Sequence, residues 1–144
     1  MRTEIVGRVL TEATLENLYD VFGAERGKIP PSQIRRVTVA DALVDTGATM
    51  LSLPARLIKQ LGLQKFSRRP VRSSTGVAEA DLYAAVRLTI QGRICTMDVL
   101  EVPDDTPVLI GQLPLEQLDF VVDLQSRTLI GNPAHGGEQM YELY

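Results

Sequence analysis

The tripeptide Asp45-Thr46-Gly47 brings together residue types that can form a catalytic turn. It follows the apolar residues 42–44, so we expect its carboxyl at the end of a buried strand. A buried carboxyl costs free energy unless hydrogen bonds or a partner charge compensate it, which favours a functional role. Gly47 lets the backbone turn and bring amide N–H groups close to the carboxylate, and the Thr46 hydroxyl can bond to neighbouring backbone. The pattern therefore predicts half of a catalytic site.

The stretch 42–49 resembles the active-site loop of the aspartic proteases, and more narrowly of their retropepsin-like branch. A second element agrees with this resemblance. In that family, two apolar residues and a glycine recur well downstream and pack behind the catalytic loop, and Val-Leu-Ile-Gly at 108–111 matches them. The family then continues with a short helix and a strand, which residues 114–118 and 120–123 fit in the same order.

The resemblance implies an all-β fold, namely a retropepsin-like acid protease barrel with one D-T-G lobe per chain and one or two short helices. It implies that residues 1–144 form a single domain. It also implies a role for each residue of the site. These are Asp45 as the catalytic residue; Thr46, Gly47, Ala48 and Thr49 as support of its loop; Ser74, Thr75 and Gly76 as the flap over the substrate; and Ile110 and Gly111 packed behind the loop.

Chain length decides how a second carboxylate is supplied. A chain of 144 residues suits one domain with one hydrophobic core, so two lobes do not fit. Aspartic protease chemistry needs two carboxylates that share a proton, and the motif occurs once. Asp105-Thr106 is not a second copy, because Pro107 follows where glycine is required and lacks the N–H of such a loop. We therefore expect a twofold symmetric homodimer with Asp45 from each subunit on the axis.

The hypothesis that follows is an aspartic endopeptidase, a hydrolase that uses this dyad to activate water against a polypeptide substrate. The resemblance implies that Thr46 bridges the two loops across the axis. Ala48 stands where pepsin-like enzymes place a hydroxyl that hydrogen-bonds the carboxylate, which predicts a working pH nearer neutral than pepsin's. The alternative hypothesis is a retropepsin-like dimerisation or peptide-binding module that keeps the fold and cleaves little.

Composition argues against several other classes of protein. The net charge is −3 and the basic residues are scattered apart from 35–36 and 65–72, so no nucleic-acid partner is expected. No segment approaches the ~20 apolar residues of a membrane span, and residues 1–4 lack the apolar run of a signal peptide. We therefore expect a soluble, cytoplasmic protein that makes no membrane contact.

The chain has one histidine, His135, and one cysteine, Cys95. This scarcity disfavours most zinc sites and any Ser/His/Asp triad, so neither a metal nor a cofactor is expected. We expect His135 to lie in a solvated loop and Cys95 to lie in the core.

Composition and periodicity predict the elements that position the motif. Residues 3–13 are rich in β-branched side chains and predict a strand, with Gly7 at a bulge. Residues 16–31 have turn composition and predict a long surface loop. Alternation through 37–45 predicts a strand that runs directly into the catalytic turn, and 54–61 predict a short helix that a glycine ends.

Residues 71–86 are the predicted flap, with a turn at 73–76 between two extended arms and Gly76 at the tip. A basic cluster stands beside the turn: Lys65, Arg68, Arg69 and Arg72. We interpret this cluster as a wetted face; the less favoured alternative is that it attracts acidic substrates beside the flap.

The C-terminal region is predicted from its glycine content and its last residues. Residues 131–137 are too rich in glycine for regular structure, whereas 140–144 could form an edge strand. In the related enzymes the chain termini pair with those of the partner subunit. The resemblance therefore makes 4–10 and 140–144 candidates for the subunit interface.

Overall fold

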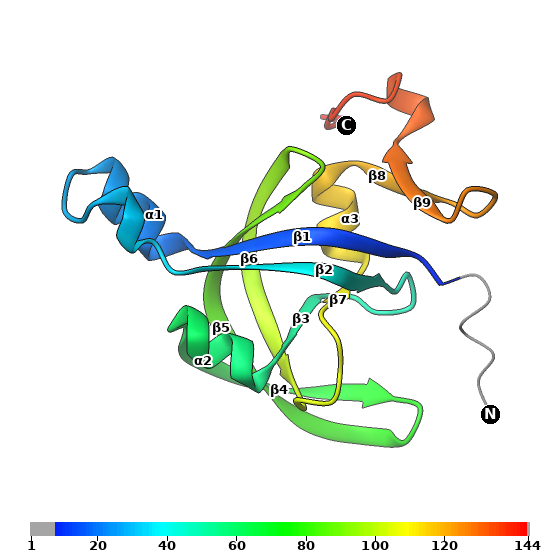
Figure 1. The fold of residues 1–144 in the computed structure, drawn as a ribbon. Coiled ribbons are helices and arrows are strands. Elements are labelled where there is room, and N and C mark those ends of the chain that lie inside the picture. Colours follow the sequence, from blue (N-terminus) through cyan, green and yellow to red (C-terminus); the bar gives the residue numbers. More distant parts are fainter. Residues whose placement is uncertain (1–7, 144) are drawn as a thin grey trace.

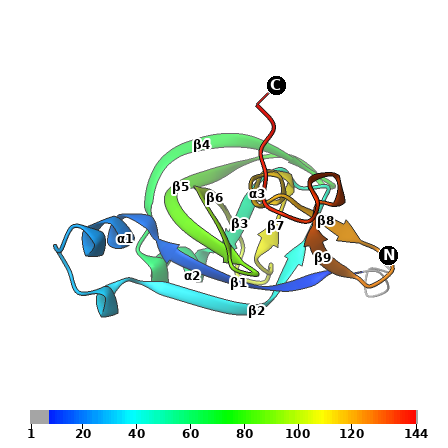
Figure 2. The same cartoon turned by 90° about the horizontal axis from the view of Figure 1, so that it is seen from above.

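A curled β-sheet dominates the computed structural model, which describes residues 8–143 (Figure 1). The strands of this sheet follow the order β1-β2-β7-β3-β6-β5-β4, and β1 also pairs with β5. Six of these described strands thereby close into a barrel, which Figure 2 shows from above. The strand β4 stays outside this ring and pairs with β5 as a hairpin. The predicted all-β barrel is confirmed.

The bounds of the elements are as follows. The strands are β1 (Leu10–Asn17), β2 (Arg36–Val44), β3 (Leu51–Pro54), β4 (Gln64–Ser73), β5 (Gly76–Ile90), β6 (Arg93–Val102), β7 (Leu109–Ile110), β8 (Phe120–Asp123) and β9 (Thr128–Gly131). The helices are α1 (Leu18–Glu25), α2 (Ala55–Leu61) and α3 (Gln112–Leu118), with the 3-10 turns η1 (Pro31–Gln33) and η2 (Pro133–His135). The described chain thus has one α-helix more than predicted.

The hydrophobic core fills the barrel and is closed by helices. Every strand of the ring contributes buried aliphatic side chains to one cluster, including Leu15, Leu51, Leu88, Val99 and Ile110. The predicted helix α2 is confirmed, and it buries three apolar side chains, Leu57, Ile58 and Leu61. It ends where Gly62 adopts a left-handed conformation that glycine tolerates best. Cys95 lies in the core as predicted, and burial raises the pKa of its thiol to about 11.

The predicted loop at 16–31 is wrong, because β1 runs on to Asn17 and α1 follows at once. The Asn17 side chain accepts a hydrogen bond from the Asp20 N–H at 3.0 Å, which caps the helix. The same side chain donates to the carbonyl of Leu61 at 2.9 Å. The two hydrogen bonds of the Asn17 side chain thus order a segment whose sequence shows only weak helical periodicity.

Glu16, at the end of β1, is the most buried acid of this region, and Arg36 and Arg87 both bind it. Burial alone would raise the pKa of Glu16, but the hydrogen bonds from the two guanidinium groups outweigh burial and lower it. The paired acid joins β1 to β2 and β5 at the point where the barrel closes.

The predicted alternation along 37–45 is also wrong in detail, because β2 contains a bulge. In the pairing of the two strands, Glu12 of β1 stands opposite two residues of β2 instead of one, so the register shifts there. Val37 and Val39 therefore face the core, but after the bulge Ala42 and Val44 do so. Leu43 consequently lies on the sheet face opposite the core, which matters for the site below.

The C-terminal region differs from its prediction, whereas much of the N-terminal prediction lies outside the described residues. Residues 1–7, with the predicted bulge at Gly7, lie outside the described residues, as does most of the interface candidate 4–10. The predicted edge strand at 140–144 is wrong for 140–143, which form no strand. Side chains, not a β-ladder, hold this segment, because the Met140 N–H donates to Asp119 and the Tyr141 hydroxyl to the carbonyl of Gln117.

Candidate active site

The loop between β2 and β3 carries the D-T-G motif at the end of a barrel strand. The Asp45 N–H donates to the carbonyl of Ile110 at 2.9 Å, which extends the pairing of β2 with β7. The Gly47 N–H then donates to Asp45 Oδ1 at 3.0 Å, as predicted from the glycine. The Ala48 N–H donates to the Asp45 carbonyl at 3.0 Å and closes the turn. The carboxylate is therefore oriented by its own loop.

The exposure of the loop changes along its length. Asp45 and Ala48 are half-buried, whereas Thr46, Gly47 and Thr49 are exposed. The Thr46 hydroxyl makes no hydrogen bond to any residue between 8 and 143, so its predicted bond to neighbouring backbone is not formed within this chain. The exposed part of the motif lies at the surface of the barrel.

The strand β7 and the start of α3 hold the loop from behind. Because β7 lies between β2 and β3, it pairs with the strands on both sides of the loop. The N–H groups of Gly111, Gln112 and Leu113 donate to carbonyls of the loop, namely those of Met50 at 3.2 Å, Ala48 at 2.8 Å and Thr49 at 2.9 Å. The first N–H groups of a helix have no partner inside the helix, so α3 satisfies them with the loop.

Gly111 is required here by its neighbours. A Cβ at this position would lie 2.5 Å from the Met50 carbonyl oxygen and 2.7 Å from that of Ala48. Both contacts are with backbone, which cannot move aside like the end of a long side chain. The structure therefore brings Gly111 directly behind the loop, and Ile110 beside it contributes its carbonyl to Asp45.

Sequence reasoning missed Gln112, whose side-chain amide donates to the Thr46 carbonyl at 3.0 Å. It missed this residue because it began the helix at Pro114, whereas α3 begins at Gln112. Proline favours the first turn of a helix, so Pro114 was itself the signal that the helix begins just before it.

The β4–β5 hairpin is confirmed and is longer than the predicted flap. Its turn is Ser74-Thr75, while Gly76, the predicted tip, is already paired with Ser73 at the start of β5. Side chains stabilise the turn, with the Thr75 N–H 3.3 Å from Ser73 Oγ. The three predicted flap residues are exposed, and no hydrogen bond joins them to the Asp45 loop within residues 8–143.

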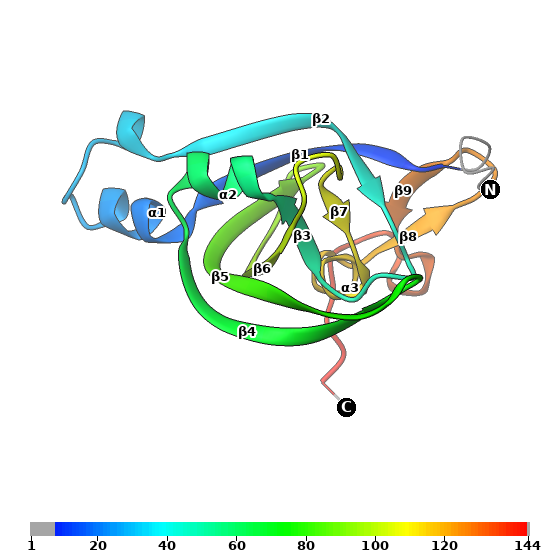
Figure 3. The same ribbon diagram turned by 90° about the horizontal axis from the view of Figure 1, so that it is seen from below.

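The hairpin and the loop nevertheless lie on the same side of the molecule. The tip is apart from the loop between β2 and β3 in Figure 1, and the two overlap in the view from below in Figure 3. Strand register connects them across the sheet, because directly paired residues point to the same face. On the face opposite the core, the paired residues from β2 to β4 are Leu43, Leu109, Ser52, Leu100, Leu82 and Ser67. This face, which we call the inner face, leads from the Asp45 loop to the hairpin.

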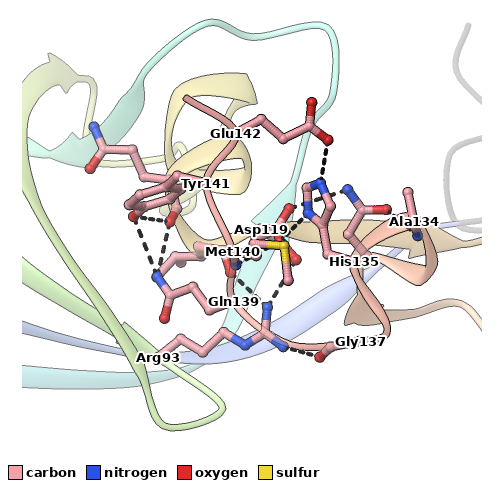
Figure 4. A network of polar contacts seen from close by, with 12 residues as sticks. Arg93, Asp119, Ala134, His135, Gly137, Gln139, Met140, Tyr141 and Glu142 are labelled. Atoms are coloured by element: carbon pink, nitrogen blue, oxygen red, sulfur yellow. Dashed lines mark hydrogen bonds and ion pairs between the residues drawn. The ribbon is translucent and has the colours of Figure 1, made fainter. Parts of the chain in front are cut away.

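A groove of about 770 Å³ begins at Thr46 and Gln112. It continues along α3 and β8 to the C-terminal strap, which we define as residues 132–143. The strap is pinned near the end of α3 by the polar network of Figure 4. The prediction of a solvated His135 is wrong, because its side chain is 13% exposed and lies between Asp119 at 2.6 Å and Glu142 at 2.8 Å.

The network of the strap contains charges that affect one another. The hydrogen bonds to Glu142 and Asp119 raise the pKa of His135. The hydrogen bond from His135 lowers the pKa of Asp119 against the opposing effect of burial. Arg93 donates to the carbonyls of Leu118 and Asp119 at 2.8 and 2.9 Å, and also to that of Gly137. The sequence contained no local signal for these contacts.

Two further observations concern cofactors and membranes. Among residues 8–143, no three His, Cys, Asp or Glu side chains gather in a way that could hold a metal ion. The described helices include none that is long and apolar enough to cross a membrane.

Comparison with known families supports the interpretation of the loop. A family model described as "Aspartyl protease" matches residues 31–113, which is more than half of the chain and includes both the Asp45 loop and Gly111. No curated protein matches the sequence closely enough to add to this result. The matched segment, the retropepsin-like barrel and the D-T-G loop agree, and the chain belongs to the aspartyl protease family.

Proposed function

We propose that this protein is an aspartic endopeptidase that acts as a homodimer, with Asp45 from each subunit forming the catalytic dyad. The observation that carries the proposal is the Asp45 loop, in which the carboxylate accepts the Gly47 N–H and the loop carbonyls are held by α3. Such a loop presents an oriented carboxylate at the surface of a rigid barrel, where a second one can meet it.

Homodimer formation is supported by groups of the Asp45 loop that have no partner among the described residues. A single chain carries the D-T-G motif once, and acid–base catalysis by a shared proton needs two carboxylates. The exposed Thr46 hydroxyl has no partner between residues 8 and 143, so it is available to bridge to the second loop. Gly47 is exposed as well, which allows a second loop to approach closely.

The proposed chemistry follows from bringing the two acids together. Two carboxylates about 3 Å apart cannot both ionise cheaply, so they share one proton and titrate as a pair. The ionised member takes a proton from a bound water, which attacks the scissile carbonyl carbon. The protonated member donates a hydrogen bond to the carbonyl oxygen and stabilises the charge that develops there. The hairpin closes over an extended peptide and excludes water.

The test compares the wild type with Asp45→Asn and, as a matched control, Asp41→Asn, which changes an exposed acid of β2 in the same way. Each protein is incubated with a mixed peptide library at about pH 3 to 8, and products are identified by mass spectrometry. We expect products from the wild type and the control, suppressed by an aspartic protease inhibitor, and none from Asp45→Asn.

Light scattering at micromolar concentration is the second measurement, because the chemistry depends on the dimer. A fully active monomer would contradict the proposal. A stable dimer that yields no products would instead favour the peptide-binding module. Ala48 predicts a pH–rate profile nearer neutral than pepsin's, and a maximum below about pH 3 would contradict that part of the proposal.

A further inference from the structure

The two faces of the β4–β5 hairpin differ in chemistry. Leu82 is on the inner face at the base of the hairpin and is only 4% exposed, whereas Arg69 farther along the same face is exposed. The paired residues that share this face toward the turn are Ser67, Arg69, Val71 and Ser73 on β4, with Leu82, Ala80, Ala78 and Gly76 on β5. Arg69 is the one charged residue among them.

The outer face carries charges of both signs, and part of them are ion-paired. Its residues are Arg68, Pro70 and Arg72 on β4, with Asp81, Glu79 and Val77 on β5. Arg68 Nε is 2.9 Å from Asp81 Oδ1, and Lys65 at the base of the hairpin is 3.5 Å from the same carboxylate. This part of the basic cluster behaves as the predicted wetted face.

Arg69 and Arg72 both make no ion pair with any residue of the described chain, but only Arg69 lies on the inner face. Its neighbours on the inner face are small or apolar, with Ala80 directly opposite and Val71 and Ala78 toward the turn. Arg69 is exposed, and these neighbours carry no charge of their own. An exposed guanidinium without a partner among the described residues is suited to a carboxylate, which it can bind through two parallel hydrogen bonds.

A second polar group on the inner face lacks a partner. Ser52 lies between Leu109 and Leu100 in the row of paired residues, and it is 4% exposed. Its hydroxyl makes no hydrogen bond to any side chain or backbone group between residues 8 and 143. A buried hydroxyl without a partner costs free energy, so such a group in a native structure calls for an explanation. A polar side chain of a bound peptide would provide the missing partner.

We propose that Arg69 selects polypeptide substrates with an aspartate or glutamate near the scissile bond. The inference rests on the proposed function, since it places the peptide between the hairpin and the inner face that leads to Asp45. When the hairpin closes, the Arg69 guanidinium binds the acidic side chain and loses water at the same time, which strengthens the interaction. The Ser52 hydroxyl lies on the same face and can donate to a polar group deeper in the site.

The test uses short fluorescent peptides of alanine, leucine and valine that carry one central Glu, Gln or Lys. Binding is measured by fluorescence anisotropy with the Asp45→Asn protein, which should leave the peptides intact. We expect the Glu peptide to bind about tenfold more tightly than the Gln peptide, as for a charge-assisted hydrogen bond. Adding Arg69→Gln should abolish this preference without weakening the Gln peptide.

Arg72→Gln is the matched control, because it removes the same charge from the outer face of the same hairpin. The proposal expects this control to keep the preference for Glu, and expects Arg69→Glu to prefer the Lys peptide. Equal binding of the Glu and Gln peptides, or an equal loss in both variants, overturns the role of Arg69. Absence of a dimer or of cleavage counts against the proposed function instead, so the two failures are distinguishable.

Discussion

The two ends of α3 hold two regions of the molecule, the Asp45 loop and the strap, in different ways. At its N-terminus, backbone N–H groups bind backbone carbonyls of the Asp45 loop, and the decisive residue, Gly111, has no side chain at all. At its C-terminus, helix carbonyls bind side chains, because Gln139 and Tyr141 both donate to the carbonyl of Gln117. The loop therefore depends on backbone geometry, whereas the strap depends on particular side chains and their charges.

Gly111→Ala should have the largest effect, because it attacks the backbone contacts of the loop. The new Cβ would overlap two carbonyl oxygens at 2.5 and 2.7 Å, so either the loop or α3 must move. We expect a loss of about 3 kcal/mol or more in unfolding free energy, together with loss of peptidase activity. Urea unfolding and the peptide library assay measure the two effects.

Gly23→Ala is the control for that prediction, since a Cβ there meets only the Ile29 side chain at an ordinary 3.6 Å. Within α1 this change should be neutral or stabilise the protein by up to about 1 kcal/mol. If Gly111→Ala proved as harmless as Gly23→Ala, the loop would not depend on close backbone packing.

Arg93→Met should have the next largest effect, and it acts at the other end of α3. It removes a donor shared by the carbonyls of Leu118, Asp119 and Gly137, and a cation that lies 4.6 Å from the centre of the Phe120 ring. We expect a loss of about 2 kcal/mol, measured by urea unfolding.

Arg56→Met is the matched control, because Arg56 is exposed on α2 and methionine has a similar helix propensity. It should change the unfolding free energy by less than about 0.5 kcal/mol. Comparable losses in both variants would mean that Arg93 contributes nothing specific to the strap.

The strap should also respond to pH, unlike the contacts at the start of α3. His135 has a raised pKa, so its contribution is complete below about pH 6.5 and is lost as the pH rises through the raised value. Asp119 has a lowered pKa, so its contribution is complete above about pH 4 and is lost as the pH falls through the lowered value. The strap should be held best between these limits.

Hydrogen exchange of the Met140 amide, which donates to Asp119, measures this window after correction for the intrinsic exchange rate. The Gln112 amide is the internal control, since its acceptor is the carbonyl of Ala48 and does not titrate. In His135→Gln the upper limit of the window should disappear. If the protection of the Met140 amide followed that of the Gln112 amide at every pH, the contacts of His135 and Asp119 would not be what holds the strap.

Gln112→Ala should have the smallest effect, because it removes one exposed side-chain bond to the Thr46 carbonyl and leaves the backbone contacts in place. We expect a loss of about 0.5–1 kcal/mol in urea unfolding. Gln117→Ala makes the same change in the same helix without removing a bond to the loop. A loss of the same size in both variants would show that the side chain of Gln112 does not support the loop.

Predictions from the sequence succeeded where the signal is local. The D-T-G loop, the helix stopped by Gly62 and the hairpin turn each rest on residues close together in the chain, whose conformational preferences act without distant partners. Gly111 was placed behind the loop by family resemblance, and the steric reason for it became visible only in the structure.

Predictions failed where a distant partner decides the local structure. The helix α1 depends on Asn17, which binds the carbonyl of Leu61, and the orientation of β2 depends on a bulge that exists only in its pairing with β1. His135 was predicted to be solvated because its neighbours are glycines, yet its ring lies between Glu142 and Asp119, the latter from another element, and both raise its pKa.

The amino-acid sequence by itself determined the family, the acid that carries the proposed chemistry and the glycines that its turns require, since these follow from residue type and short spacing. The tertiary structure alone decided which side chains share the inner face with the Asp45 loop and which are held at the ends of α3. The physical reason is that a one-residue bulge reverses the direction of every following side chain, and ion pairs form between groups that only the folded chain brings together.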